Sequence, residues 1–495
     1  MLLRKHFASR LTSYFSNPSI IGITSPLPFP FKNEVAYRRK IQQLYDQSSS
    51  QTTTQQWFTP VELFKPFYSI ALANCIAQHT CDYDRLRIIE LGPGTGRNAR
   101  AILDHLADFH PELYNKKLVE FVALDTSAHL LETARKTVTE RVPGHVHDHD
   151  HSHLFLGVHG ELCADENPTD LDGISKLEKI LQDNVADLSD STPLATLNIV
   201  VALELLDNLG HDKIRIRNSR KKRRRDAVPT SELQLETLRG KYAFDQYFLS
   251  PIIKTTTIPN SPPQLIESSV KLTDPVLSAF VSDPNILKSL LSKSDAGNIV
   301  GEGDMEAVVG SNKSGGDHIE SEGGVFFVPT VAFELIRRIK SAIDRNNDLP
   351  HHPNKTKKDG VGYIFADFDF LPDRIIPGYN SPVVTDMDLV DHSDYKNLNL
   401  DADYLFPTDF NLLRTILQTE GGRGGKKRHT RVEKQGAFLG RFLDESVIQK
   451  TNCTSGFEIF GAKKWNPLLM DFSNCSVVTS LLHGNELVVK EQLED

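Results

Sequence analysis

Residues 87–96 read RIIELGPGTG, and this stretch decides the fold. Arg87–Leu91 is a short apolar run typical of a buried strand, and a helical pattern begins at Asn98. Between them lie Gly92, Gly94 and Gly96. Glycine tolerates positive φ and lets a ligand approach the backbone, and the start of a helix offers free N–H groups. The stretch therefore predicts a strand, a ligand-binding turn and a helix.

A second strand and the acid at its end extend this pattern. Leu118–Leu124 predicts a strand that ends at Asp125, and residues 126–139 predict a helix. Strand, glycine turn, helix, strand, acid and helix are the opening of a doubly wound, mostly parallel α/β sheet. A carboxylate at the position of Asp125 can accept hydrogen bonds from both ribose hydroxyls of a nucleoside cofactor.

The spacing of the glycines separates two classes of cofactor. The dinucleotide fingerprint GxGxxG needs a third glycine, where this chain has Arg97 or Ala99, depending on which glycine starts the count. Alanine is tolerated at that position, so the spacing weakens a dinucleotide cofactor without excluding it. The form E-x-G-x-G-x-G that begins at Glu90 instead resembles the first motif of class I S-adenosylmethionine methyltransferases. This resemblance implies S-adenosyl-L-methionine as the cofactor. It implies five cofactor-binding residues: Glu90, Gly92, Gly94, Gly96 and Asp125.

Further segments resemble one family, in the order in which that family has them. They are FTPVELFKPF at 58–67, LELLDNL at 203–209, YIFADF at 363–368 and QGAFL at 435–439. Together with the glycine loop they are similar to the MidA family, which includes a mitochondrial arginine methyltransferase that assists respiratory complex I assembly. The resemblance implies a class I methyltransferase-like fold with long polar insertions and added helices. It also implies protein arginine methylation, with a subunit of a respiratory complex as an expected substrate.

Glu204 and Asp207 are the candidate catalytic residues. They follow the apolar run Asn198–Leu203, at the carboxyl edge where a doubly wound sheet binds ligands. A guanidinium substrate stays protonated, so carboxylates are needed to orient it and to localise its charge. The alternative is that one of the two acids caps the turn that follows the strand.

Two other functions stay open. On the substrate side the chain has Leu203 and Gly210 where the family has Asn and Pro. These differences suggest a methyltransferase fold that has lost catalysis and serves as an assembly or scaffold protein. The basic run RKKRRR at 220–225 and the segment GGRGG at 421–425 suggest an RNA methyltransferase instead. The net charge of −9 argues against a nucleic-acid partner.

The N-terminus has the composition of a mitochondrial transit peptide. Residues 1–33 contain no Asp or Glu, and their apolar residues recur at helical spacing beside Arg and Lys. We expect them to direct the protein to the mitochondrial matrix, and the alternative is an ordinary flexible terminus. The five scattered cysteines suit a reducing compartment, and no apolar run approaches the roughly 18 residues of a membrane span.

The remaining chain divides by composition. Residues 34–85 predict a linker and a helical segment, and 86–485 predict the methyltransferase-like domain, with the core beginning at Trp57. Polar insertions are expected near 141–192, 218–232, 285–323, 345–360 and 420–432. Five histidines alternate from His145 to His153. We expect a low-complexity loop there and predict no metal site.

Overall fold

The structure is a computed structural model. It describes residues 3–7, 20–22, 27–50, 55–57, 59–140, 149–162, 172–183, 194–218, 242–251, 265–294, 324–347, 358–372, 374–386, 390–396, 402–419, 428–454 and 465–482. Within these ranges no helix combines the length and the hydropathy that a membrane crossing needs.

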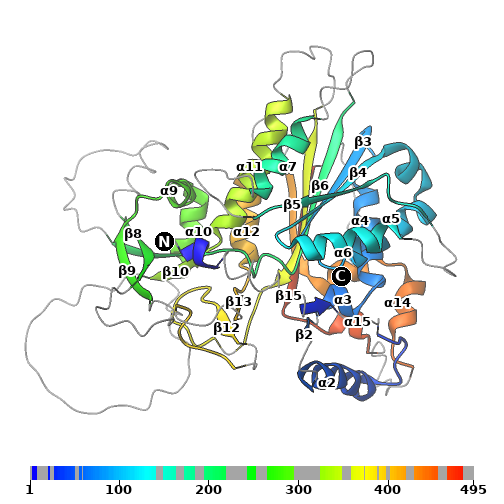
Figure 1. The fold of residues 1–495 in the computed structure, drawn as a ribbon, viewed down its shortest axis with the longest axis horizontal. Helices are drawn as coiled ribbons and strands as arrows, with labels where there is room; N and C mark the ends of the chain where they lie inside the picture. The colour runs from blue at the N-terminus through cyan, green and yellow to red at the C-terminus, as the bar shows by residue number, and fades with distance from the viewer. Residues whose placement is uncertain are drawn as a thin grey trace, which may run out of the picture.

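A seven-stranded sheet forms the centre of the molecule (Figure 1). Its order is β14-β15-β11-β6-β3-β4-β5. The strands are β3 (Arg85–Leu91), β4 (Leu118–Asp125), β5 (Phe155–His159), β6 (Thr196–Leu203), β11 (Gly360–Phe368), β14 (Arg428–Lys434) and β15 (Cys475–Leu482). The five strands from β11 to β5 are parallel, and β15 runs antiparallel to both of its neighbours. The predicted doubly wound, mostly parallel sheet is confirmed.

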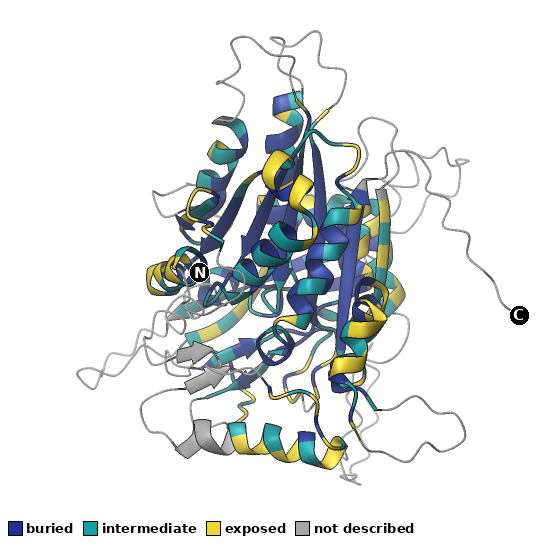
Figure 2. Cartoon of the chain, turned by 90° about the vertical axis from the view of Figure 1, so that its right-hand side faces the viewer, coloured by how far each residue is buried: buried dark blue, intermediate teal, exposed yellow. Residues whose placement is uncertain are grey.

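Helices cover both faces of this sheet. One face carries α4 (Phe67–Gln78), α5 (Arg97–Phe109) and α13 (Gln435–Phe442), and the other carries α7 (Gly173–Asp183), α11 (Thr330–Asn347) and α12 (Phe410–Thr419). Strands covered on both sides read as continuous apolar runs, which is why β3 and β6 stand out in the sequence. Figure 2 shows the same strands buried, whereas α2 (Glu34–Ser50) is exposed along its outer side. The chain order reverses between β3 and β6, and such a switch point is where open α/β sheets bind ligands.

A smaller antiparallel sheet stands beside the main one (Figure 1). It consists of β10 (Val325–Val328), β7 (Asp212–Asn218), β8 (Tyr242–Pro251) and β9 (Leu265–Lys271), in that order. The helices α9 (Pro275–Ser282) and α10 (Pro284–Ser294) follow β9. The other elements are β1 (Ile20–Gly22), β2 (Gln55–Trp57), α3 (Pro60–Leu63), η1 (Leu113–Lys117), α6 (Ala128–Thr139), β12 (Val383–Thr385), β13 (Asp403–Leu405), α14 (Glu445–Thr451) and α15 (Pro467–Met470).

Several predicted insertions contain parts of the fold. The segment near 141–192 holds β5 and α7, the segment near 420–432 holds most of β14, and α10 begins the one near 285–323. Their polar composition reflects edge positions, because β5 and β14 are the two outer strands of the sheet. The runs at 220–225 and 421–425, and His145 and His147, lie outside the described residues.

The core begins earlier than Trp57, and that expectation is wrong. Phe31 and Tyr37 are buried against the cluster that includes α4, and the Tyr37 hydroxyl donates a 2.5 Å hydrogen bond to Asp471. Leu3 and Phe7 are also buried, in a separate cluster beside the small sheet. Phe31 and Tyr37 are isolated aromatic residues without a period, and the helical spacing of Leu3 and Phe7 is also the pattern of a targeting peptide, so the sequence did not mark these segments as core.

The two glycines of α13 provide a matched test of its packing. A Cβ at Gly436 would overlap the carbonyl oxygen of Leu469, whereas a Cβ at Gly440 would meet nothing within 4 Å. We expect Gly436→Ala to lower the free energy of unfolding by about 1–3 kcal/mol through overpacking. Gly440→Ala should raise it by about 0.5–1 kcal/mol, because it reduces the conformational entropy of the unfolded chain and favours the helix. Urea unfolding measures the change in the free energy of unfolding of each variant. Equal changes in the two variants would contradict this packing.

Candidate functional site

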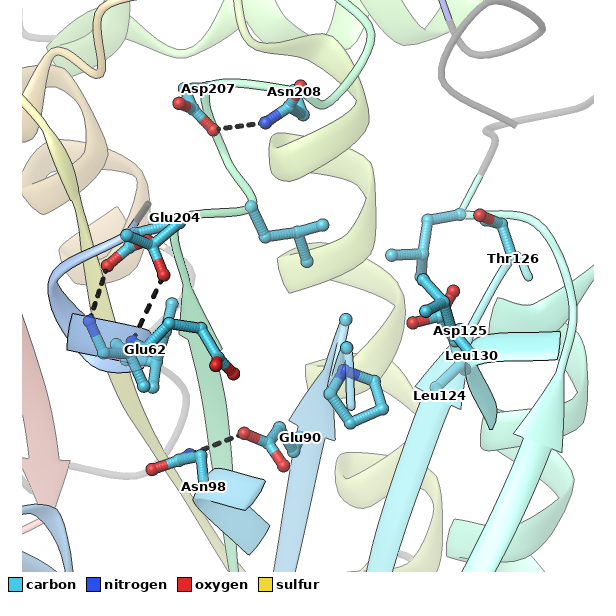
Figure 3. A pocket seen from close by; sticks show the side chains of 18 of the residues that line it. Glu62, Glu90, Asn98, Leu124, Asp125, Thr126, Leu130, Glu204, Asp207 and Asn208 are labelled. Atoms are coloured by element: carbon cyan, nitrogen blue, oxygen red, sulfur yellow. Dashed lines mark hydrogen bonds between the residues drawn. The ribbon is translucent and has the colours of Figure 1, made fainter. Parts of the chain in front are cut away.

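A cavity of about 320 Å³ lies at the carboxyl ends of β3, β4 and β6, at the switch point of the sheet. Figure 3 shows its side chains, with Glu62, Glu90 and Glu204 on one side and Asp125 opposite them. Its lining residues are Thr59, Val61, Glu62, Glu90, Gly92, Pro93, Gly94, Asn98, Leu124, Asp125, Thr126, Leu130, Leu162, Leu203, Glu204, Leu205, Asp207, Asn208, Phe368, Asp403 and Leu405. The predicted cofactor side and the two predicted catalytic acids therefore share one cavity.

The glycine loop forms one wall. Gly92, Gly94 and Gly96 have φ values of 66°, 52° and 76°, a region that glycine adopts without strain. Gly92 and Gly94 line the cavity, and a Cβ at Gly92 would lie 3.1 Å from a methyl group of Leu205. Gly96 is not among the lining residues. A Cβ there would lie 2.6 Å from the Cα of Ala134, so Gly96 lets the loop pack against α6.

Two acids flank the loop, and burial changes the ionisation of both. Asp125 ends β4 and accepts a 2.8 Å hydrogen bond from the backbone N–H of Ser127. Burial raises its pKa to about 6, although backbone N–H groups, including that of Gly94, oppose the rise. Glu90 accepts a 2.6 Å hydrogen bond from the Asn98 amide, and burial raises its pKa to about 7. The Oε2 atom of Glu90 is buried and has no partner within the described ranges.

Glu204 directly follows β6, and its side chain reaches α3 on the side of the cavity where Glu62 lies. Its φ of 52° is unusual for a residue with a side chain, and its backbone N–H donates to Ala366 at 2.8 Å. Its Oε1 accepts a 3.2 Å hydrogen bond from the N–H of Val61 in α3, so it does not cap the turn that follows β6. Its Oε2 is buried without a partner in the described part of the chain. Burial raises the pKa of Glu204 well above its usual range.

Asp207 lies beside Asn208 at the end of the cavity away from Glu90 (Figure 3). Its Oδ1 accepts a 2.9 Å hydrogen bond from the Asn208 amide, and its N–H donates to Asp367 Oδ2 at 2.9 Å. Burial raises its pKa well above the usual range, and the charges of Asp367 and Asp403 add to this effect. Burial also raises the pKa of Asp367 to about 7 and that of Asp403 to about 6.

The cavity is rich in acidic groups. Six acids line it: Glu62, Glu90, Asp125, Glu204, Asp207 and Asp403. None of its lining residues in the described ranges is Lys or Arg. Lys65 and Arg97 contact Glu62 at 2.5 and 3.8 Å, but neither lines the cavity. Carboxylates held close together and away from water favour a positively charged ligand, because such a ligand lowers their mutual repulsion.

Four residues of the site were not predicted. Glu62 lies within the segment FTPVELFKPF, and Asp367 ends the apolar run of β11, so both had a sequence signal. Asn98 is the second residue of α5, directly after the glycine loop, and could have been found from that position. Asp403 comes from the short strand β13, and nothing in its surrounding sequence points to a site.

The histidine-rich segment pairs with nearby carboxylates. His149 Nε2 lies 2.8 Å from Asp108, and His151 Nε2 lies 2.8 Å from Asp104. His151 is fully buried, and its Nδ1 lies 2.7 Å from the Tyr114 hydroxyl. Over the described residues, no group of three His, Cys, Asp or Glu side chains is placed to hold a metal ion. These two histidines therefore fasten the loop before β5 to α5.

The cavity fits a nucleoside cofactor by several independent features. Its volume is typical of a small-molecule site. Gly92 and Gly94 leave room for close approach of a ligand to the backbone, and Asp125 stands at the ribose position of the doubly wound fold. The unpartnered oxygens of Glu90, Glu204 and Asn208 are buried acceptors that a bound ligand can satisfy.

Comparisons with known proteins give the following matches. A family profile with the description "Putative S-adenosyl-L-methionine-dependent methyltransferase" matches residues 69–424. A crystal structure of a COG1565 superfamily member from Burkholderia thailandensis, bound to S-adenosyl-homocysteine, is 13% identical with a TM-score of 0.49, over 98% of this chain and 89% of that one. A second COG1565 structure from the same organism is 13% identical with a TM-score of 0.43, over 85% and 80%. No curated protein sequence matches the chain.

Asp125→Asn tests the cofactor side of the cavity. The amide keeps the shape of the side chain but loses the charge that strengthens hydrogen bonds to ribose hydroxyls. We expect the affinity for S-adenosyl-homocysteine, measured by calorimetry, to fall by about 1.5–3 kcal/mol. Glu112→Gln is the control, because Glu112 forms an exposed ion pair with Lys116 outside the cavity and should leave the affinity unchanged. Equal affinity in all three proteins would remove Asp125 from the site.

Proposed function

Because the chain belongs to a family of S-adenosyl-L-methionine-dependent methyltransferases, we propose that it methylates an arginine side chain of a protein. The family match covers most of the chain, and it confirms the resemblance to the MidA family and the predicted cofactor. The family match does not identify the substrate, so the arginine side chain is the part of this proposal that goes beyond it.

The acidic lining of the cavity supports this choice of substrate. Six carboxyl groups and no basic side chain in the described residues face the space that cofactor and substrate would share. The sulfonium of S-adenosyl-L-methionine and the guanidinium of arginine are both cations, so the cavity attracts both. A nucleic acid brings phosphate charge, which the same carboxylates repel. The proposal therefore favours a cationic protein side chain over RNA.

Glu204 and Asp207 would serve the substrate in this proposal. S-adenosyl-L-methionine, when bound, supplies an electrophilic methyl group on sulfur. The two carboxylates accept N–H hydrogen bonds from the guanidinium and hold its charge away from the nitrogen that is methylated. That nitrogen loses a proton as it gains the methyl group. The bound guanidinium favours the ionised form of both carboxyl groups, whose pKa values burial raises in the ligand-free protein, so either carboxylate can accept this proton. Leu203, Leu205 and Leu405 give the cavity apolar walls that limit access of water.

A binding protein without catalysis is the second candidate. His211, which lies near a histidine position of the family, is buried and stacks on Phe406 with a centroid distance of 4.0 Å. Burial lowers its pKa to about 4, and it does not line the cavity. His211 therefore cannot contact a substrate in the cavity as the structure stands, which favours a protein without catalysis. Isotope transfer from labelled S-adenosyl-L-methionine to protein or RNA in an extract separates the candidates, because a scaffold binds the cofactor and labels neither.

We also propose the mitochondrial matrix as the location and a respiratory complex subunit as the protein substrate. The acid-free, amphipathic sequence of residues 1–33 and the resemblance to the MidA family support this proposal. Leu3, Arg4 and Phe7 are buried in the fold, so the proposal takes the signal as retained after import. A fluorescent protein fused to residues 1–40 should enter mitochondria. Accumulation of the full-length protein in the nucleus would contradict the location and would make residues 220–225 the targeting signal.

Glu204→Gln and Asp207→Asn should separate chemistry from cofactor binding. Each amide keeps the shape of the side chain and removes the negative charge that a guanidinium needs. We expect turnover to fall about 10²–10³-fold in each variant, the scale of one lost preorganised electrostatic contact. The affinity of each variant for S-adenosyl-homocysteine, which lacks the sulfonium charge, should change much less than its turnover does.

The same control and one further measurement complete this test. Glu112→Gln removes an exposed carboxylate outside the cavity and should keep full turnover. Thermal unfolding of each variant detects a structural role of the acid, since loss of a capping contact costs about 0.5–2 kcal/mol of stability. Turnover equal to wild type in both amide variants would exclude the guanidinium site.

A further inference from the structure

The N-terminal residues 3–7 form one helical turn whose arginine is held by two buried acids. One guanidinium nitrogen of Arg4 lies 2.6 Å from Asp212 Oδ2 and 3.0 Å from Asp274 Oδ1, and the other lies 2.7 Å from Asp274 Oδ2. The backbone N–H of Arg4 donates to Asp212 Oδ1 at 3.2 Å. Arg4 is only 1% exposed, so the guanidinium is enclosed on all sides.

Both acids are positioned by parts of the chain other than this turn. Asp212 accepts a 2.8 Å hydrogen bond from the Thr330 hydroxyl. Asp274 caps α9 through a 2.8 Å hydrogen bond from Leu277 N–H, and its own N–H donates to Gln246 at 3.0 Å. The carboxylates therefore form a preorganised fork for a guanidinium, whatever chain supplies it.

The side chains around Arg4 make the site selective for shape as well as for charge. Phe7 packs on Phe406 with a centroid distance of 5.0 Å and on Tyr404 at 5.5 Å. Leu3 is fully buried in the same cluster, one helical turn away from Phe7. Gly210 approaches so closely that a Cβ there would lie 2.5 Å from the Arg4 carbonyl oxygen. Asp212, Asp274, Gly210, Tyr404 and Phe406 thus form a groove around residues 3–7, which fits a helical turn with the pattern apolar–Arg–x–x–aromatic.

This groove adjoins the methyltransferase cavity. The N–H of Phe406, which contacts Phe7, donates to the carbonyl oxygen of Asp207 at 2.8 Å. Asp207 and Leu405 line the cavity, and Phe406 is the next residue after Leu405. A segment bound in the groove therefore contacts the residue that adjoins the cavity wall. In Figure 1 the N-terminus lies beside α10 and the small sheet, far along the chain from the elements that it contacts.

We propose that Asp212 and Asp274 form a docking site for an arginine-bearing helical segment of the protein substrate, which residues 3–7 occupy in cis. The site takes a guanidinium by charge and two apolar anchors by shape, and it holds the substrate next to the cavity. Calling the partner the substrate rests on the proposed function, whereas the binding of the segment does not.

Peptide binding to the full-length Arg4→Ala variant tests the site. The probe is a labelled peptide of residues 1–10, and its control carries Gln in place of Arg4. Since the variant's own segment has lost its guanidinium, we expect it to bind the probe at least tenfold more tightly than wild type does. The Gln peptide should bind at least tenfold more weakly than the probe, and Asp274→Asn added to the variant should abolish this preference. A folded variant that binds neither peptide, or binds both equally, would overturn the proposal.

A second protein covers the case in which Arg4→Ala does not fold. A protease site placed between residues 8 and 19 of the otherwise wild-type chain is cut after folding, so Arg4 is present while the protein folds. The labelled probe should then exchange with the cut segment while the remainder keeps a cooperative melting transition. A cut segment that never exchanges, or whose release unfolds the protein, would show a fixed structural part and overturn the proposal. All measurements omit the cofactor, so absence of methyl transfer would not affect their outcome.

Discussion

The site depends on acidic groups that are buried in one cavity, where no Lys or Arg is among the described lining residues. Burial raises the pKa of Glu90 to about 7 and that of Asp125 to about 6, and it also raises the pKa values of Glu204 and Asp207 well above their usual range. An acid whose pKa is higher in the folded than in the unfolded protein destabilises the fold as pH rises from about 4 towards neutrality. A bound cation offsets this cost. The same feature that lowers the stability of the ligand-free protein therefore gives selectivity for cationic ligands.

The sheet makes this arrangement possible, because its parallel strands bring acids from distant segments to one edge. Asp125, Glu204 and Asp367 each lie at or just past the carboxyl end of a strand, and positive φ at Gly92 and Gly94 keeps the loop between them open. Carboxylates on several strands need no local motif, only the same topological position. The docking groove also joins acids from distant segments, but by a different arrangement, because Asp212 begins the antiparallel strand β7 and Asp274 caps α9.

Sequence alone predicted the central sheet and, within the cavity, the glycine loop and four acids, because those signals are local. The apolar run, the glycines and Asp125 lie within 40 residues of each other, and Glu204 and Asp207 directly follow another apolar run. Asp403 and Arg4 could not be predicted in the same way. Arg4 pairs with Asp212, which is 208 positions away, and Asp403 comes from a strand of three residues. Such contacts depend on the assembled fold and leave no periodic trace in the sequence.

Proton release on ligand binding tests the central claim most directly. S-adenosyl-L-methionine and S-adenosyl-homocysteine differ by a methyl group and its positive charge, so their difference isolates the response of the cavity to charge. Calorimetry in buffers of different ionisation enthalpy, between pH 6 and 8, should show that binding of S-adenosyl-L-methionine releases more protons than binding of S-adenosyl-homocysteine. The affinity of S-adenosyl-L-methionine relative to the neutral-sulfur ligand should rise with pH as Glu90 and Asp125 ionise. Identical proton release and pH dependence for the two ligands would contradict the account.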